Sequence, residues 1–283
     1  MSGGSAATPD MDIRDLHTLD EYRAVVDLER EIWGYTDTGD IITVPVFIIT
    51  VKRGGILIGA FEAERMIGFA FSLVGMKNGR PTQWSHMMGV VPEHRRGGLG
   101  RALKLAQRDR AIAAGFDLME WTFDPLQALN AHLNFARLGV VCDEYVRNLY
   151  GESTSALHRG TPTDRFVVEW RLREPHVERR ISRASSTLTV RDGEAAAAPS
   201  VNETFQQGPW RRTGPGNLEL DSRRVWIEVP VGFTEMQQQE PEVAIEWRLH
   251  TRAMFEHYFG RGYRAVDFEL QREERRGRYL LAR

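Results

Sequence analysis

The sequence predicts a mixed α/β fold, and three patterns along the chain support that prediction. The first is a strand at 83–91 that breaks at Pro92 and continues through a glycine-rich turn directly into an amphipathic helix. The second is the order strand, helix, helix and hairpin before this stretch. The third is a strand, a helix and two further strands after it. This alternation favours a sheet covered by helices.

The part of the chain before the glycine-rich turn divides into short elements separated by polar or glycine-containing turns. The expected order is a disordered lead at 1–10, a strand at 11–16, a helix at 20–33, a loop at 34–40, a helix at 45–53 and a hairpin of 55–63 and 66–76. The pair Gly54-Gly55 ends the second helix, and Glu64-Arg65 forms the tight turn of the hairpin.

The part after the turn predicts two groups of elements around a region of different composition. The expected elements are a strand at 117–123, a helix at 126–138, strands at 140–150 and 165–172, a strand at 224–230, a helix at 241–260 and a hairpin of 263–270 and 278–281. Between them, residues 175–216 are rich in Ser, Ala, Gly and Pro, which favours a linker or surface excursion with at most short ordered pieces. An edge strand at 188–190 is one such piece.

The glycine-rich turn has the composition of an anion-binding helix start, and we call residues 90–101 the cradle. The first turn of a helix carries N–H groups without partners and partial positive charge, so an anion is stabilised there. Glycines remove the Cβ atoms that would keep a phosphate away from those amides. The residues expected to bind it are Arg95, Arg96, Gly97, Gly98, Leu99, Gly100 and Arg101, and Lys104 is expected to add positive charge at the same end.

The spacing within the cradle resembles a known motif. Val90-x-Pro92-x-x-Arg95-x-x-Gly98-x-Gly100 resembles the acetyl-CoA-binding motif of the GNAT (GCN5-related N-acyltransferase) superfamily. The segment 130–139 resembles the second motif of that superfamily. Trp33-Gly34, the segment 121–126 and Tyr150-Gly151 are similar to an incompletely characterised bacterial branch of it.

The resemblance implies a mixed central sheet with helices on both faces, complete within residues 11–174. It also implies acetyl-CoA or another acyl-CoA as cosubstrate, bound to the cradle between two splayed strands. Val90 and Val91 would offer backbone N–H groups to the oxyanion, and Asn130 would help to bind the cofactor or the acceptor.

The candidate catalytic residues are His86, Asp124 and Tyr145. His86 stands six residues before Pro92, a position that resembles that of a catalytic histidine in arylalkylamine N-acetyltransferases, and imidazole titrates near neutral pH. A structural histidine is the alternative. Asp124 follows the second splayed strand and would order water or the acceptor, or else cap the helix that begins at Pro125.

One position departs from the superfamily. Four residues before Gly139, where many GNAT enzymes carry a tyrosine that can protonate the departing thiolate, this chain has Phe135. Phenylalanine donates no proton, so the thiolate leaves without a dedicated acid, or Tyr145, Tyr150 or Cys142 serves instead.

The last third of the chain is similar to the middle third in the order of its expected elements. Both follow the order β-α-β-β, and Phe135-x-x-x-Gly139 has a counterpart in Tyr258-x-x-x-Gly262. Residues 217–283 are therefore interpreted as a degenerate half-repeat without a cradle of its own. The alternative is an unrelated α+β extension that packs on the core or builds a homodimer interface.

The composition of the chain argues against several classes of function. The formal net charge of −2 over 283 residues argues against a general nucleic-acid or anionic-membrane binder. Cys142 is the only cysteine, which favours a reducing compartment, and the N-terminus lacks the features of a signal peptide, so the cytoplasm is expected. The longest apolar run, 41–51, is too short to span a membrane. No set of residues has metal-ligand spacing.

The sequence thus predicts an acyl-CoA-dependent N-acyltransferase in which the amine of a small molecule, such as an amino acid, attacks the thioester directly. Succinyl-CoA as donor enters by resemblance alone. The competing prediction is a non-catalytic CoA-binding or regulatory protein, which Phe135 and the unusual C-terminal third favour.

Overall fold

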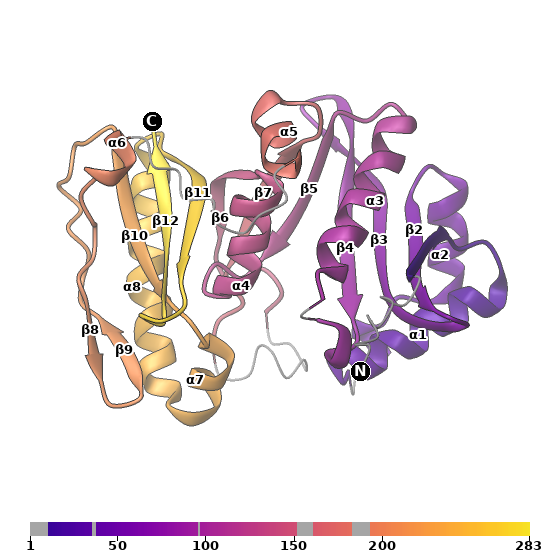
Figure 1. The fold of residues 1–283 in the computed structure, drawn as a ribbon, viewed down its shortest axis with the longest axis horizontal. Coiled ribbons are helices and arrows are strands. Elements are labelled where there is room, and N and C mark those ends of the chain that lie inside the picture. Colours follow the sequence, from indigo (N-terminus) through magenta and orange to yellow (C-terminus); the bar gives the residue numbers. More distant parts are fainter. Residues whose placement is uncertain (1–10, 36–37, 96, 152–160, 183–192) are drawn as a thin grey trace, which may run out of the picture. The chain divides into compact units, whose positions relative to one another are not determined.

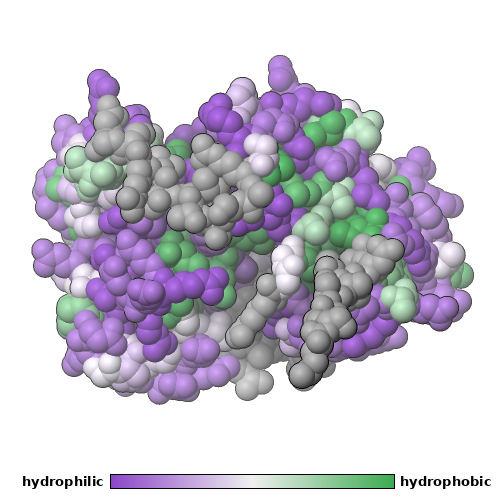
Figure 2. Space-filling view, viewed as in Figure 1, coloured by the Kyte–Doolittle hydropathy of each residue, from purple (hydrophilic) through white to green (hydrophobic). Residues whose placement is uncertain are grey.

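The computed structural model describes residues 11–35, 38–95, 97–151, 161–182 and 193–283. The expected disordered lead at 1–10, the expected edge strand at 188–190 and Arg96 lie outside these ranges. The chain forms two compact units, Met1–Phe116 and Asp117–Arg283, which are described separately as unit 1 and unit 2. Hydrophilic residues dominate the face seen in Figure 2, in line with a chain of which 27% is charged.

Unit 1 is an antiparallel sheet in the order β1-β2-β3-β4 with three helices (Figure 1). Its strands are β1 (Met11–Asp15), β2 (Ile56–Glu62), β3 (Arg65–Lys77) and β4 (Arg80–Val90). Its helices are α1 (Leu19–Trp33), α2 (Val44–Lys52) and α3 (Leu99–Ala113), with short turns η1 (Thr38–Asp40) and η2 (Pro92–His94). Helix α1 begins after Thr18, which shares a capping box with Glu21, so Thr18 and not Asp20 caps this helix.

The helices of unit 1 cover both faces of its sheet, and glycines let them approach closely. A Cβ on Gly89 would lie 2.6 Å from Ile32 and 2.9 Å from Trp33 of α1. A Cβ on Gly68, which faces the other way, would lie 3.3 Å from Leu103 of α3. Helix α1 therefore lies against one face of the sheet and α3 against the other, which confirms the predicted mixed α/β class.

A β-bulge interrupts β4 at His86. Ser72 of β3 pairs with Ser85 and the preceding Phe71 pairs with Met87, so His86 is an extra residue without a partner on β3. Simple alternation predicts that His86 shares a face with Met88, but Met88 lies under α3, 3.6 Å from where a Cβ on Gly100 would be. The ring of His86 instead meets Phe71 edge-on, with centroids 6.2 Å apart.

Unit 2 contains two groups of strands with the same topology. The first group is β5 (Leu118–Phe123), β6 (Val141–Val146) and β7 (Arg165–Arg171), paired in the order β5-β7-β6. The second is β10 (Arg224–Pro230), β11 (Arg264–Gln271) and β12 (Arg276–Ala282), paired in the order β10-β12-β11. In each group the last strand lies between the other two, and all pairs are antiparallel. The half-repeat itself stays a prediction.

The two groups meet where β6 pairs with β11, at Cys142 and Ala265. Cys142 lies three positions after Gly139, a left-handed glycine with φ 76°. Ala265 lies three positions after Gly262, a left-handed glycine with φ 82°. The register of the β6–β7 pairing shifts between Cys142 and Glu144, and that of the β11–β12 pairing shifts between Ala265 and Asp267. We call this meeting point the β6–β11 junction.

The helices of the two groups differ. After β5 the chain forms four α-helical residues, α4 (Ala128–Ala131), and then a π-helical turn, η3 (His132–Leu138), in place of the expected regular helix. After β10 it forms α7 (Phe233–Gln239) and the long α8 (Pro241–Gly260), seen beside the yellow strands in Figure 1. No described helix is long and apolar enough to cross a membrane.

The region expected to be a linker contains short ordered elements. They are α5 (Pro175–Ser182), α6 (Gly193–Ala196), β8 (Thr204–Gln207) and β9 (Trp210–Thr213). Backbone hydrogen bonds tie this region to β10, from the N–H of Trp226 to Pro199 O (2.9 Å) and from the N–H of Val201 to Trp226 O (2.7 Å). Part of the expected linker thus runs along a strand of the second group.

Candidate functional site

The end of β4 directs one backbone amide away from β3. The N–H of Val91 donates to Ile67 O at 3.0 Å, so Val91 occupies a hydrogen-bonded position of the ladder. Val90 pairs with Gly68 at the neighbouring position and therefore points its N–H to the other edge of β4. Of the two residues expected to face an oxyanion, Val90 directs its amide away from β3, while the amide of Val91 is bonded to β3.

The turn that follows forms an open helix start. Gly98 is the N-cap of α3, has φ 84° and makes no side-chain cap. A Cβ on Gly98 would meet no atom within 4 Å, and one on Gly97 would meet only His94 O at 3.8 Å. In the part of the chain that the structure describes, the N–H groups of Leu99 and Gly100 have no backbone acceptor. These amides and the open space beside them fit a phosphate oxygen.

Two arginines of the cradle lie within the described residues. The Nε of Arg95 donates to Val90 O at 3.0 Å, which fixes the turn against the end of β4. Arg101 lies in the first turn of α3, where its charge adds to the positive field of the helix start. Arg96 lies outside the described residues, so it stays a prediction.

Lys104, which was expected to add positive charge at the cradle, instead lies in a buried polar cluster between β4 and α3. Sequence reasoning missed this cluster. The ammonium group of Lys104 donates to Ser85 Oγ at 2.7 Å and to Gln107 Oε1 at 3.4 Å, and Ser85 Oγ donates to Gln107 Oε1 at 2.9 Å. Burial lowers the pKa of Lys104 to about 7. A polar residue on the inner face of an amphipathic helix was the available signal.

His86 lies at the bulge of β4 and is exposed. Neighbouring side chains nevertheless exclude part of the water around its ring, and this desolvation lowers its pKa. The imidazole is therefore neutral at neutral pH, the state in which it accepts a proton.

Asp124 follows the end of β5 and is held in a buried ion pair. Its two carboxylate oxygens accept hydrogen bonds from Arg248 of α8 at 2.8 and 2.6 Å, and Oδ1 also accepts the N–H of Leu126 at 2.9 Å. Burial favours the neutral carboxyl group, but Arg248 outweighs it and the pKa of Asp124 is lowered. A carboxylate paired in this way positions the chain and is a poor proton acceptor.

Tyr145 of β6 belongs to a second ion-pair group. Its hydroxyl donates to Asp164 Oδ2 at 2.6 Å, and Arg252 of α8 donates to both oxygens of Asp164 at 2.8 and 2.9 Å. Burial raises the pKa of Tyr145 well above its usual value. Arg248 and Arg252 are one helical turn apart, so the same face of α8 binds both acidic groups.

Phe135 lies in the π-helical turn and is fully buried. Its ring meets Tyr279 of β12 edge-on, with centroids 5.5 Å apart. The hydroxyl of Tyr279 donates to Pro125 O at 2.7 Å, so it is committed to the chain after β5. The C-terminal group of strands thus packs on the position where many GNAT enzymes carry tyrosine.

Of the other groups expected to replace that tyrosine, Tyr150 is the accessible one. Its hydroxyl shares a hydrogen bond of 2.8 Å with Thr122 Oγ1 of β5, and 48% of the residue is exposed. Cys142 is fully buried, its thiol donates to Glu144 O and Val167 O, and burial raises its pKa well above the usual value.

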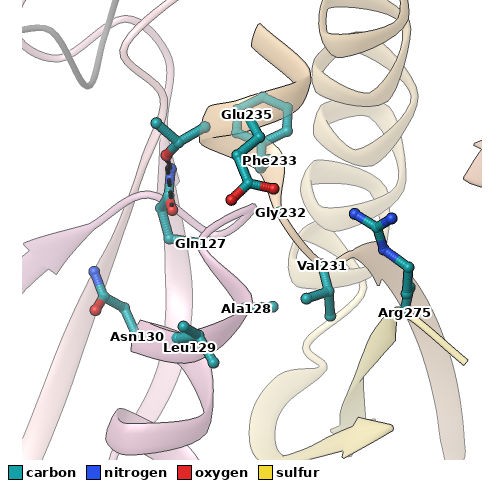
Figure 3. A pocket seen from close by; sticks show the side chains of 10 residues that line it. Gln127, Ala128, Leu129, Asn130, Val231, Gly232, Phe233, Glu235 and Arg275 are labelled. Carbon is teal, nitrogen blue, oxygen red and sulfur yellow. Dashed lines mark hydrogen bonds between the residues drawn. The ribbon is translucent and has the colours of Figure 1, made fainter. Parts of the chain in front are cut away.

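A cavity of about 360 Å³ opens in unit 2 beside Asn130 (Figure 3). It lies where β5 and β10 end, and the turn between β11 and β12 adds one residue. Its lining residues are Gln127, Ala128, Leu129, Asn130, Val231, Gly232, Phe233, Thr234, Glu235 and Arg275. Among the described residues, no group of three or more His, Cys, Asp or Glu could hold a metal ion.

The structure therefore distributes the predicted residues over two units. Val90, Arg95, Gly98 and His86 belong to unit 1, and the groups around Asp124, Asn130 and Tyr145 belong to unit 2. Sequence reasoning missed Arg248, Arg252, Thr234 and Tyr279, which lie far along the chain from their partners. The spacing of the two arginines on one face of the predicted helix at 241–260 was the only available signal.

Comparison of the sequence with protein-family models and with curated proteins gives no match. Several solved structures are similar to this one. The ribosomal-protein-S18-alanine N-acetyltransferase from Escherichia coli is 18% identical, with a TM-score of 0.44 over 63% of this chain and 99% of that chain. yncA from Salmonella typhimurium, solved with acetyl-CoA, is 18% identical, with a TM-score of 0.45 over 58% of this chain and 95% of that one.

A third similar structure is an acetyltransferase of the GNAT family from Streptococcus pneumoniae. It is 15% identical, with a TM-score of 0.45 over 56% of this chain and 98% of its own.

Proposed function

We propose that the chain is an acyl-CoA-dependent N-acyltransferase that transfers an acetyl or succinyl group to the amine of a small molecule. The observation that carries this proposal is the cradle. A strand ends with one outward N–H at Val90, and an uncapped helix start with open space follows at Gly98. The first feature suits a developing oxyanion and the second suits a pyrophosphate.

The cofactor would be bound by the amides of Leu99 and Gly100, by Arg95, Arg96 and Arg101, and by the strand end at Val90 and Val91. When bound, acyl-CoA supplies the activated acyl group. Asn130 is proposed to contact the cofactor from the start of α4. Asp124, paired with Arg248, keeps this segment in place and acts as a positioning residue.

The proposed reaction is direct transfer. The amine nitrogen attacks the thioester carbon, a C–N bond forms, the C–S bond breaks and the proton of the amine passes to a base. His86 is proposed as that base because it is exposed and neutral. Tyr150 is proposed to return a proton to the thiolate, since its hydroxyl is accessible and Phe135 has none to give.

The cradle is tested by substituting Gly98 with Asp and, as a matched control, with Asn. Both side chains tolerate a left-handed backbone and cap a helix start, so both variants are expected to fold. The added charge of Asp repels a phosphate, so G98D should bind acetyl-CoA and succinyl-CoA at least about tenfold more weakly than G98N in isothermal titration. Equal binding by both variants would contradict a phosphate site.

The proton transfers are tested by His86→Ala and Tyr150→Phe. Thiol release over a panel of amines should fall about 100-fold for H86A at neutral pH, because general-base catalysis contributes about that much. Acyl-CoA affinity should stay unchanged. Tyr150→Phe should lower kcat without changing KM for the amine. Equal losses of affinity and turnover in H86A would indicate a structural histidine.

A second candidate function is a CoA-binding or regulatory protein without catalysis. Phe135 favours it, because the hydroxyl group common in the superfamily at this position is missing. Isothermal titration with acyl-CoA, followed by thiol release over the amine panel, separates the two. Tight binding without turnover on any amine would favour the regulatory protein, and absence of binding would exclude both.

A further inference from the structure

The cavity in unit 2 is built by the two half-repeats together. Gln127 to Asn130 follow β5, and Val231 to Glu235 follow β10, the corresponding strand of the second group. Figure 3 shows Gln127, Leu129 and Asn130 on one wall and Val231 and Arg275 on the other. Its volume of about 360 Å³ lies in the range of pockets for small molecules.

Hydrogen bonds and an ion pair fix the walls of this cavity. The side chain of Gln127 donates to Thr234 Oγ1 at 3.0 Å and accepts from it at 3.3 Å, which joins the two segments. Phe233 is buried against the guanidinium of Arg248, 5.1 Å from its ring centroid. Arg248 in turn pairs with Asp124, so both walls rest on one buried ion pair. The cavity is therefore preformed.

Opposite charges lie close together at its rim. A Cβ on Gly232 would be 3.2 Å from Glu235 Oε2 and 3.5 Å from Arg275 Nη2. Across the described residues, no cation comes within the ion-pair distance of 4.0 Å of the Glu235 carboxylate, and this includes Arg275. The guanidinium of Arg275 stacks over Trp210 at 5.0 Å and makes one long bond, 3.4 Å, to Pro209 O.

A ligand that satisfies both charges must carry both signs. An anion alone would approach Glu235 unfavourably, and a cation alone would approach Arg275 unfavourably. The amide side chains of Gln127 and Asn130 add donors and acceptors on the facing wall. A small molecule with an ammonium group and a carboxylate meets all of these conditions.

We propose that this cavity binds a small amino acid, with its ammonium group at Glu235 and its carboxylate at Arg275. Arginine suits the carboxylate because its planar donors match two oxygens. Gly232, with φ 85°, leaves the space between the two charges open.

The test uses the full-length chain and isothermal titration with L-alanine, L-glutamate and L-lysine, and with their N-acetyl and carboxamide derivatives. The free amino acid that fits best should bind at least about tenfold more tightly than either of its derivatives, since each derivative loses one charge pair. Glu235→Gln should weaken the free amino acid but not its N-acetyl derivative. Arg275→Gln should weaken it but not its carboxamide. Glu242→Gln and Arg179→Gln, exposed positions of unit 2 outside the cavity, should bind as the wild type does.

The outcomes separate this inference from the proposed function. No binding of any free amino acid, or unchanged binding in both E235Q and R275Q, would overturn the site. Failure of the chain to bind acyl-CoA would overturn the proposed function and leave the amino-acid titrations valid.

Discussion

Among single residues, Glu29 is a buried carboxyl group of unit 1. It lies on α1 and is fully buried. Its Oε2 accepts the N–H of Ile42 at 3.0 Å, while Oε1 has no hydrogen-bond partner in the described part of the chain. Burial raises the pKa of Glu29 to about 7. The folded state therefore binds a proton that the unfolded chain has lost above its ordinary pKa.

Glu29→Gln should change how stability depends on pH. Because the folded pKa is raised, the wild type loses stability as pH rises from about 4.5 to about 7, and each pKa unit corresponds to about 1.4 kcal/mol. E29Q lacks this loss and can still accept the Ile42 N–H. Its free energy of unfolding relative to the wild type should rise by about 3 kcal/mol between pH 4 and pH 8 in urea titrations. Glu31→Gln, at an exposed position of α1, is the control and should show no such trend.

His86 shows which features of a residue can be predicted from the sequence and which cannot. Its place on the strand at 83–91 and its distance from Pro92 could be predicted, because both are local. The extra residue in β4 could not, since a bulge depends on the register with β3. Alternation therefore placed His86 on the same face as Met88, whereas the bulge separates them.

Among the elements, α8 does most to hold the segment after β5. Its Arg248 and Arg252 bind Asp124 and Asp164, and both carboxylates are almost inaccessible, at 8% and 0% exposed. The start of α3, by contrast, is determined by neighbours in sequence, its glycines and arginines. The cradle could be predicted for that reason. The partner of Asp124 is 124 positions away, and nothing local to Asp124 identifies it.

Arg248→Met should destabilise unit 2 strongly. Removing one partner of a buried ion pair leaves an uncompensated charge, which costs about 3–5 kcal/mol. The double variant R248M/D124N should recover part of this loss in urea unfolding, because no full charge stays buried. Arg252→Met should cost less, since Asp164 keeps its bonds from Tyr145 and from the N–H of Asn148. Equal effects of the two single variants would contradict the central role of Arg248.

At the scale of the whole molecule, the two groups of strands in unit 2 share a topology for which the sequence gives little signal. Tyr258-x-x-x-Gly262 could suggest it, because a left-handed glycine ends the helix in both halves. The pairing of Cys142 with Ala265 joins strands far apart along the chain and has no sequence signal. The short elements within 175–216 were equally difficult to predict, since their bonds go to β10.

The reactivity of the single cysteine, Cys142, reports whether the β6–β11 junction opens. Cys142 is fully buried, and burial raises its thiol pKa, so reagents react only when the junction opens. Labelling with a thiol reagent at pH 8 should be at least about a thousandfold slower in native buffer than in denaturant, given the usual stability of domains. The fully denatured chain gives the reference rate. Rapid labelling under native conditions would show that the junction is open.

The arrangement around β5 has a consequence for how the chain behaves on dilution. Many proteins complete a binding site with residues of a neighbouring subunit, and such sites are lost when the oligomer dissociates on dilution. Here Arg248, Thr234 and Tyr279 brace the segment after β5 from within the same polypeptide. Because these contacts form within one chain, they do not depend on the protein concentration. The cavity therefore stays assembled at any abundance of the protein.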